Sequence, residues 1–148
     1  MSNRDELPFE TTIEVRDSCL CLHLQRAARA VARRFDAALR PVELTSGQFS
    51  LLMSLNRRQP PSIGSVSALL AMDRTTLTAN LKPLQRRGLV TVTMDAADRR
   101  TRRLGLTPAG RALLAAAMPV WRRTHAAVER LVPMSGPDGL RADLRALS

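Results

Sequence analysis

Residues 72–106, which read MDRTTLTANLKPLQRRGLVTVTMDAADRRTRRLGL, decide the fold of this 148-residue chain. The first half of this segment has a narrow apolar stripe at helical spacing, formed by Leu77, Leu81 and Leu84. Such a stripe predicts an amphipathic helix that packs its apolar side against a core. Asp73 can cap this helix at its N-terminus, and Gly88 can stop it after Arg87. Pro83 lies inside the helix, so we expect a kink or a tightened last turn there.

The rest of this helix surface is polar and becomes basic toward its C-terminal end. Short threonine and asparagine side chains let a helix backbone approach the base edges of a DNA major groove. Lysine and arginine side chains farther along can reach phosphates. An ordinary solvated helix face is the alternative interpretation. The residues of this polar face are Thr75, Thr76, Thr78, Ala79, Asn80, Lys82, Arg86 and Arg87.

The second half of the segment predicts a β-hairpin with a charged tip. Residues 89–94 alternate apolar and polar side chains, and residues 101–106 form a second candidate strand. Four of the five residues from 99 to 103 are arginine. An arginine-tipped ribbon can enter a DNA minor groove, where the negative potential is strongest in narrow tracts. A charged turn that protects an edge strand is the alternative. We expect Asp98 to hold a nearby arginine in one rotamer.

Two further helices are predicted before this segment. Thr45 and Gln48 have the spacing of a capping box and open a helix over residues 49–56. A short helix over residues 63–70 follows the break at residues 59–61. A short helix, a tight turn and a polar helix in this order indicate a helix-turn-helix.

Helices are also predicted at both ends of the chain. Residues 1–15 look extended and weakly ordered, and a long helical pattern runs over residues 17–39. After a cap at Thr107, helices are predicted over residues 109–131, with a proline bend, and over residues 139–147. Their apolar faces exceed what a small winged core can cover, so we expect a two-fold homodimer.

The charge balance indicates a polyanionic partner. Lys and Arg number 23 against 13 Asp and Glu, which gives a formal net charge of +10. Nucleic acid is the commonest partner of so basic a chain. Residues 1–10 lack the apolar run of a signal peptide and no long apolar stretch follows, so we expect a cytoplasmic protein without membrane contact. Catalytic triads, phosphate-binding loops and paired apolar carboxylates are missing, so we expect no enzyme and no cofactor.

Several motifs together resemble the MarR family of winged helix-turn-helix regulators. The resemblance covers about residues 18–147. It implies a mainly α-helical fold with a small β-hairpin wing, an α+β arrangement. The motifs that carry it are LTSGQF (44–49), MDRTTLT (72–78), LQRRGLV (84–90), DAADRR (95–100) and LGLTPAG (104–110).

The family resemblance also implies an architecture and a function. Residues 1–148 would be one domain, with dimerisation helices over residues 17–40 and 108–148 around a winged helix-turn-helix core at residues 45–106. The homodimer would regulate transcription by binding a palindromic operator in double-stranded DNA, as a repressor released by a small-molecule effector. Arg100 is the first choice for the minor groove. The expected DNA-binding residues are Arg74, Thr75, Thr76, Thr78, Asn80, Lys82, Arg86, Asp98, Arg99, Arg100 and Arg102.

The resemblance further implies a ligand site between the dimer helices and the winged domain. Members of the family bind small aromatic or phenolic anions there. His23, Arg26 and Trp121 are the candidates to line such an effector pocket in this chain. Simple packing of His23 and Trp121 is the alternative interpretation.

A C-x-C-x-H pattern places Cys19, Cys21 and His23 close together. With one other histidine in the chain, we expect no zinc site. Cys21 falls on the apolar stripe of the first helix, which favours core packing. A thiol-based, peroxide-sensing repressor that uses Cys21 stays open, although the chain lacks the tyrosines of relatives that sense in this way. A winged-helix adaptor for RNA or protein is a further alternative, because fold alone does not determine function.

Overall fold

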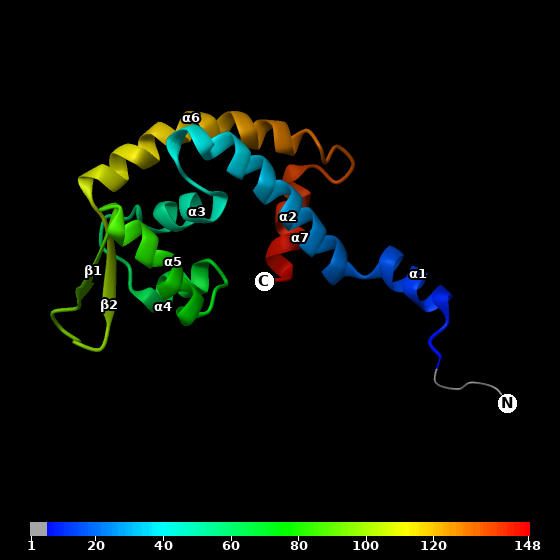
Figure 1. The fold of residues 1–148 in the computed structure, drawn as a ribbon, viewed down its shortest axis with the longest axis horizontal. Helices are drawn as coiled ribbons and strands as arrows, with labels where there is room; N and C mark the ends of the chain where they lie inside the picture. Colours follow the sequence, from blue (N-terminus) through cyan, green and yellow to red (C-terminus); the bar gives the residue numbers. More distant parts are fainter. Residues whose placement is uncertain (1–5) are drawn as a thin grey trace.

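Seven α-helices and one antiparallel β-hairpin make up the computed structural model, which describes residues 6–148 (Figure 1). This arrangement confirms the mainly α-helical fold with a small wing. The elements are α1 (Phe9–Ser18), α2 (Leu20–Leu39), the 3-10 helix η1 (Arg40–Val42), α3 (Ser46–Leu55), α4 (Ile63–Leu69), α5 (Arg74–Arg86), β1 (Val90–Met94), β2 (Arg102–Leu106), α6 (Pro108–Glu129) and α7 (Pro137–Ala146).

The core lies where α3, α4, α5 and the hairpin meet the first half of α6. Burial of apolar surface there supplies the main driving force for folding. The predicted stripe of α5 is inside this core, because its three leucines are at most 2% exposed. The largest fully buried side chains are Leu39, Leu52, Leu77, Leu81, Leu84, Leu104 and Val66.

Side-chain caps determine where the core helices begin. Thr45 and Gln48 form the predicted capping box, with each side chain bonded to the other residue's backbone N–H at 3.1 Å. Asp73 caps α5 by accepting from the Thr76 N–H at 2.8 Å. These bonds satisfy amide groups that a helix N-terminus leaves without partners.

The turn between α4 and α5 contains a residue in the left-handed region. Ala71 has a φ of 49°, a conformation that glycine adopts most readily. The hydroxyl of Ser67 donates to the Met72 carbonyl across this turn, and the Met72 N–H donates to the Ser67 carbonyl at 3.0 Å. These bonds hold the tight turn that completes the helix-turn-helix.

The hairpin is joined to the helices at its base. Val90 pairs with Leu106 and Met94 pairs with Arg102, which matches the predicted strands. The Leu104 N–H donates to the Pro61 carbonyl at 2.9 Å, so the segment before α4 pairs with the outer edge of β2. The wing is therefore held against the start of α4.

Thr107 connects the start of α6 to the end of α5. Its hydroxyl donates to the Gly88 carbonyl at 2.6 Å, and its N–H donates to the Leu89 carbonyl at 3.1 Å. The same hydroxyl accepts from the Gly110 N–H and caps α6. From this junction α6 follows a curved path over the core (Figure 1), as expected for a helix that contains Pro119.

The N-terminal expectations are wrong in two respects. Phe9–Ser18 is a helix rather than an extended segment; the part of that expectation that concerns residues 1–5 lies outside the described residues. The helix predicted over residues 17–39 is broken at Cys19, which has an extended backbone with a ψ of 109°. Both errors arose because α1 is exposed and polar, so the apolar periodicity that predicts helix boundaries is weak there.

Both ends of the chain expose large apolar side chains. No helix within residues 6–148 combines the length and the apolar character that a membrane span needs. Those apolar side chains lie on α1, α2 and α7 and in the segments that flank these helices and follow α6. They are Leu7, Phe9, Val15, Leu20, Leu131, Met134, Leu144 and Leu147.

We expect Gly110→Ala to lower the free energy of unfolding by about 1–3 kcal/mol. A Cβ at residue 110 would lie 2.2 Å from the Leu89 carbonyl oxygen, which is backbone and already bonded to Thr107. Gly139 is the matched control, because it also follows a helix-starting proline by two residues and a Cβ there would meet nothing within 4 Å. Gly139→Ala should raise stability by roughly 0.5–1 kcal/mol. Urea unfolding measures both, and equal effects would contradict the close approach at Gly110.

Candidate nucleic-acid interface

The outward face of α5 is polar and fully accessible. Leu77, Leu81 and Leu84 anchor the opposite face in the core, so packing determines which side chains point out. Arg74, Thr75, Thr78, Ala79 and Lys82 line a shallow hollow of about 360 Å³ on this face. Short side chains on an exposed helix bounded by two basic residues are what major-groove reading requires.

Two residues of this face are already engaged within the chain. The Thr76 hydroxyl donates to the Asp73 carboxylate at 2.8 Å, and the Asn80 amide lies 3.6 Å from the Met72 sulfur. The hydrogen bonds from Thr76 also lower the pKa of the Asp73 carboxyl. Thr75 and Thr78 have no side-chain hydrogen bond recorded within residues 6–148, so their hydroxyls are available to an external partner.

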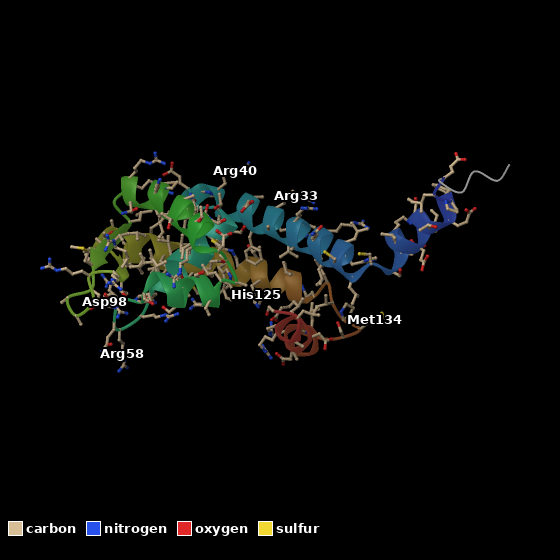
Figure 2. The ribbon with its side chains drawn as sticks, turned by 90° about the horizontal axis from the view of Figure 1, so that it is seen from below. Arg33, Arg40, Arg58, Asp98, His125 and Met134 are labelled. Carbon is tan, nitrogen blue, oxygen red and sulfur yellow. The ribbon has the colours of Figure 1, made fainter. Side chains whose placement is uncertain are left out.

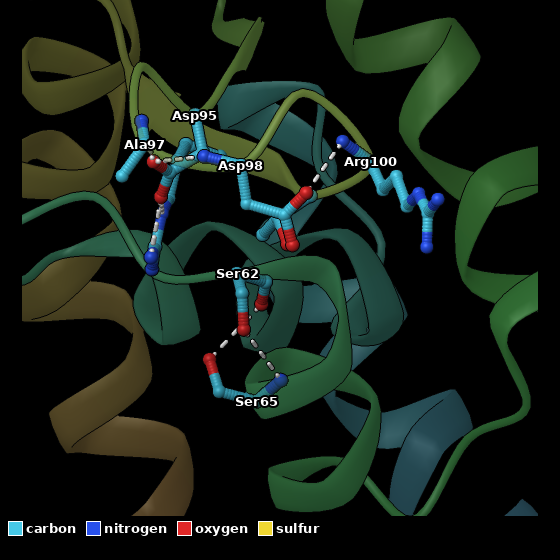
Figure 3. Close-up of polar contacts among 8 residues, drawn as sticks. Ser62, Ser65, Asp95, Ala97, Asp98 and Arg100 are labelled. Carbon is cyan, nitrogen blue, oxygen red and sulfur yellow. Dashed lines mark hydrogen bonds and ion pairs between the residues drawn. The ribbon is translucent and has the colours of Figure 1, made fainter.

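Asp98 organises the backbone of the wing tip rather than an arginine side chain. Its carboxylate accepts from the Arg100 N–H at 3.0 Å and from the Thr101 hydroxyl at 3.2 Å (Figure 3). The prediction that Asp98 holds a guanidinium is therefore wrong. The carboxylate of an aspartate within a turn readily accepts a hydrogen bond from the backbone N–H of the residue two positions later in the sequence, which here is Arg100.

The guanidinium is held by Asp95 instead. The Arg103 Nε donates to Asp95 at 2.6 Å, and Nη2 lies 2.6 Å from the same oxygen. The N–H groups of Ala97 and Asp98 donate to the other oxygen at 2.7 and 3.3 Å. The bond from the Ala97 N–H, then the Arg103 side chain and then the Asp98 N–H lower the pKa of the Asp95 carboxyl. Arg103 is thus a structural residue of the wing.

The remaining wing arginines carry free positive charge at the tip. The Arg102 Nη1 donates to the Arg99 carbonyl at 3.0 Å. The guanidinium groups of Arg99 and Arg100 have no hydrogen bond or ion pair recorded in the described part of the chain. Figure 3 shows the Arg100 side chain extending away from Asp98, while its backbone stays fixed by that residue. The backbone of Arg100 is therefore held in place by Asp98, while its guanidinium keeps its positive charge.

A cleft of about 300 Å³ joins α5, the wing and the start of α4. Three guanidinium-bearing residues from distant parts of the sequence line it, which suits a phosphate group. Gly64 leaves room for one of them, because a Cβ there would lie 3.0 Å from the Arg74 Nη2. The lining residues are Ser62, Ile63, Gly64, Arg74, Thr78, Arg100, Thr101 and Arg102.

Sequence reasoning missed Ser62 and Gly64 as members of this cleft. Ser62 caps α4, with its hydroxyl accepting from the Ser65 N–H at 3.1 Å. The serine before an apolar helical run is an N-cap signature that could have drawn attention to this end of α4. Gly64 offered no comparable signal, since its role depends on the position of Arg74.

The predicted effector residues are divided between two hollows of the same chain. His23 and Arg26 line an open hollow of about 520 Å³ on α2. Trp121 lines a separate apolar cavity of about 350 Å³ between α3, α4 and α6. Its ring stacks on His125 with centroids 4.5 Å apart and faces Phe49 at 6.2 Å. The structure does not bring Trp121 together with His23 and Arg26 within one chain.

The cysteines differ from the expected packing. Cys21 is exposed, so the prediction that it packs in the core is wrong; it lies in the first turn of α2, whose only buried residue is Leu39 at the opposite end of the helix. The Cys19 sulfur accepts from the Leu22 N–H at 3.5 Å, and the His23 Nδ1 lies 2.8 Å from the Cys19 carbonyl oxygen. In residues 6–148, no three histidine, cysteine, aspartate or glutamate side chains gather as metal ligands do.

Comparisons with known proteins agree on one family. The MarR family profile matches residues 44–101, which include α4, α5 and the tip of the wing. The transcriptional repressor NicR of Pseudomonas putida is 34% identical over 121 residues, covering 80% of this chain and 72% of NicR. The transcriptional regulator TtmR of Methylorubrum extorquens is 35% identical over 97 residues, covering 66% of this chain. The match spans only 50% of the length of TtmR.

The fold has solved counterparts that hold DNA. The transcriptional regulator MosR of Mycobacterium tuberculosis, crystallised with DNA, superposes with a TM-score of 0.80 at 38% identity. The superposition covers 88% of this chain and 93% of MosR, so it includes most of the flanking helices as well as the winged core.

We expect acid to release Arg103 from Asp95. The folded-state pKa of Asp95 lies below its ordinary value, so its stabilising contribution is complete above the unfolded pKa, near 4. The contribution is lost as the pH falls through the lowered folded value. An NMR titration of the Arg103 side-chain N–H from pH 6 to pH 2 would follow the release.

Asp95→Asn is the control for this titration. The amide oxygen can still accept from the Ala97 N–H, but it has no charge to hold Arg103. Its Arg103 resonance should stay unperturbed by pH. A wild-type resonance that moves only with global unfolding would show that the Asp95 charge does not hold the wing.

Proposed function

Because the chain belongs to the MarR family, we propose that it is a homodimeric transcriptional repressor that binds a palindromic operator in double-stranded DNA. The cleft between α5 and the wing carries this proposal. There the two DNA-reading elements of a winged helix-turn-helix present Arg74, Arg100 and Arg102 to one space with no carboxylate among the lining residues. An arrangement of this kind suits a nucleic-acid backbone better than a small substrate.

The proposed contacts follow from which side chains are free. Thr75 and Thr78 reach base edges, while Lys82 and Arg86 bind phosphates and set the register of α5. Arg100 enters the minor groove from a backbone that Asp98 fixes. The Thr76 hydroxyl and the Asn80 amide already bond within the chain, so these two residues contact DNA through the other atoms of their side chains. The full proposed set is Arg74, Thr75, Thr76, Thr78, Asn80, Lys82, Arg86, Asp98, Arg99, Arg100 and Arg102.

A two-fold dimer is part of the proposal. The apolar side chains left exposed on α1, on α7 and in the segment between α6 and α7 support an association surface at the end of the molecule opposite the wing. A two-fold axis there presents two recognition helices to successive half-sites. The chain is then one domain whose residues 45–106 bind DNA, and its place of action is the cytoplasm, where a bacterial operator lies.

We expect Arg100→Ala to weaken operator binding by about 1–3 kcal/mol without lowering the thermal stability of the protein. Within residues 6–148 the Arg100 guanidinium makes no hydrogen bond or ion pair with another residue, so we expect its removal to affect mainly an external partner. Fluorescence anisotropy with a duplex from the protein's own promoter, at fixed salt concentration, measures the loss. Arg40→Ala is the charge-matched control, since Arg40 lies far from the wing (Figure 2).

Two outcomes would contradict this proposal. Unchanged operator affinity in Arg100→Ala would remove Arg100 from the interface. Equal affinity of the wild type for the promoter duplex, random DNA and RNA would favour a winged-helix adaptor over a sequence-specific repressor.

We propose that a small aromatic or phenolic ligand releases the DNA. The cavity beside Trp121 supports this proposal, because it is mostly apolar, holds about 350 Å³ and offers a ring for stacking. Leu69 and Leu70 at the end of α4 also line it. His23 and Arg26 line a different hollow and are assigned no contact with this ligand in the same chain.

Thiol oxidation is the alternative signal. The exposure of Cys21 favours it, since a peroxide must reach the sulfur to oxidise it. The Gln25 side-chain amide donates to the Cys21 sulfur at 3.5 Å.

One set of measurements separates the two signals. If 4-hydroxybenzoate releases the operator from the wild type and from Cys21→Ser but not from Trp121→Ala, a ligand at Trp121 is the signal. If cumene hydroperoxide releases it from the wild type and from Trp121→Ala but not from Cys21→Ser, the thiol is the signal. Failure of both compounds to release the wild-type complex would contradict both proposals.

A further inference from the structure

Helix α1 extends away from the body of the molecule with its apolar side chains uncovered. Figure 1 shows it as an arm beyond the end of α2, and none of its residues is buried. Phe9 is 71% exposed and Val15 is 51% exposed. Phe9 and Ile13, four positions apart, form a short apolar edge of α1, and Val15 lies on another side of the helix. A ten-residue helix that lies exposed in this way is unstable alone in water, so it needs a surface to lie on.

The arm is acidic on the side next to that apolar edge. Glu10 and Glu14 lie one helical turn apart, and neither carboxylate has an ion pair recorded within residues 6–148. Asp17 falls on the same side, but it is already paired with Arg16 at 2.6 Å. The arm therefore offers two free negative charges about 6 Å apart along its axis.

A basic groove on α2 has the complementary character. It has a volume of about 520 Å³, and no acidic residue lines it. Arg26, Arg29 and Arg33 have no ion pair recorded in the described chain, and Arg33 projects from the outer side of α2, away from α7 (Figure 2). The groove is lined by His23, Arg26, Ala27, Arg29, Ala30 and Arg33.

The arm cannot reach the basic groove of its own chain. Only Cys19 separates α1 from α2, and its φ of −69° and ψ of 109° direct the two helices apart. Two antiparallel helices need a connection of about 2–5 residues to fold back on each other. The occupant of the groove must come from elsewhere, and a second copy carries an arm of the right charge.

We propose that α1 of one protomer docks into the basic groove on α2 of a second copy, and that the two arms are exchanged in this way. Antiparallel docking pairs Glu10 with Arg33 and Glu14 with Arg29, because both pairs of residues are four positions apart. Ala27 and Ala30 are small enough to let the apolar edge around Phe9 approach α2. Two-fold symmetry makes both exchanges occur together. The proposal rests on the homodimer of the proposed function and adds a second, electrostatic contact to it.

Charge reversal tests the exchange in the full-length protein. One variant carries Glu10→Arg and Glu14→Arg, and the other carries Arg29→Glu and Arg33→Glu. Each alone places like charges together and should weaken dimerisation about tenfold, since exposed ion pairs are individually weak but four are lost together. Sedimentation equilibrium measures this change. Arg57→Glu with Arg58→Glu, on the loop before α4, is the charge-matched control and should leave dimerisation unchanged.

Mixing the two reversed variants gives the decisive result. In a mixed dimer each reversed arm meets a reversed groove, or a normal arm meets a normal groove, so all four pairs are attractive again. Native mass spectrometry should then find mixed dimers well above the statistical share of one half. A statistical mixture, or wild-type dimerisation in either reversed variant, would overturn the exchange.

Two results separate this inference from the proposed function. If the wild type dimerises and binds its operator but the variants mix statistically, only the arm exchange is wrong. If the wild type is monomeric and binds no operator, the proposed function itself is wrong, and the exchange falls with it. If reversal of the groove weakens DNA binding but not dimerisation, the groove serves nucleic acid and the exchange is also overturned.

Discussion

Burial of three leucines beneath α5 is the constraint on which the rest of the structure depends. Leu77 and Leu84 are completely buried and Leu81 is 2% exposed, so α5 can adopt only one rotation about its axis. That rotation turns the threonines outward beside the wing. Replacing packed side chains such as these costs several kcal/mol, which is a large part of the stability of a small domain. The orientation of the polar face is therefore a consequence of packing rather than of its own interactions.

The wing depends on a division of roles between two carboxylates. Asp95 holds the Arg103 guanidinium at the base of the tip, and Asp98 holds the backbone of Arg100 and the hydroxyl of Thr101. Arginine in the first role is neutralised and stays structural, whereas arginine at the tip keeps its charge. The wing thus contains one arginine paired with a carboxylate and others that are free to meet a partner. The number of arginines in the sequence segment does not tell these two roles apart.

Helix α4 lies between the two hollows that matter most for the proposed function. Its first residues line the cleft beside Arg74, and Leu69 at its other end lines the apolar cavity beside Trp121. The helix has only seven residues, so the two hollows lie about 10 Å apart along its axis. A ligand that fills the proposed effector cavity would press on the same element that shapes the cleft, which gives release of DNA a short physical route.

The sequence by itself determined the elements whose signals are local. The α5 stripe, the Thr45–Gln48 capping box, the hairpin strands and the Thr107 cap all follow from side-chain period or from partners three residues away, and each is present in the structure. Tertiary structure alone decided the contacts between distant segments. It brought Gly64 beneath Arg74, assigned Arg103 to Asp95, separated Trp121 from His23, and left Cys21 exposed at the start of α2. These features depend on how whole elements pack in three dimensions, and no local spacing in the chain encodes that packing.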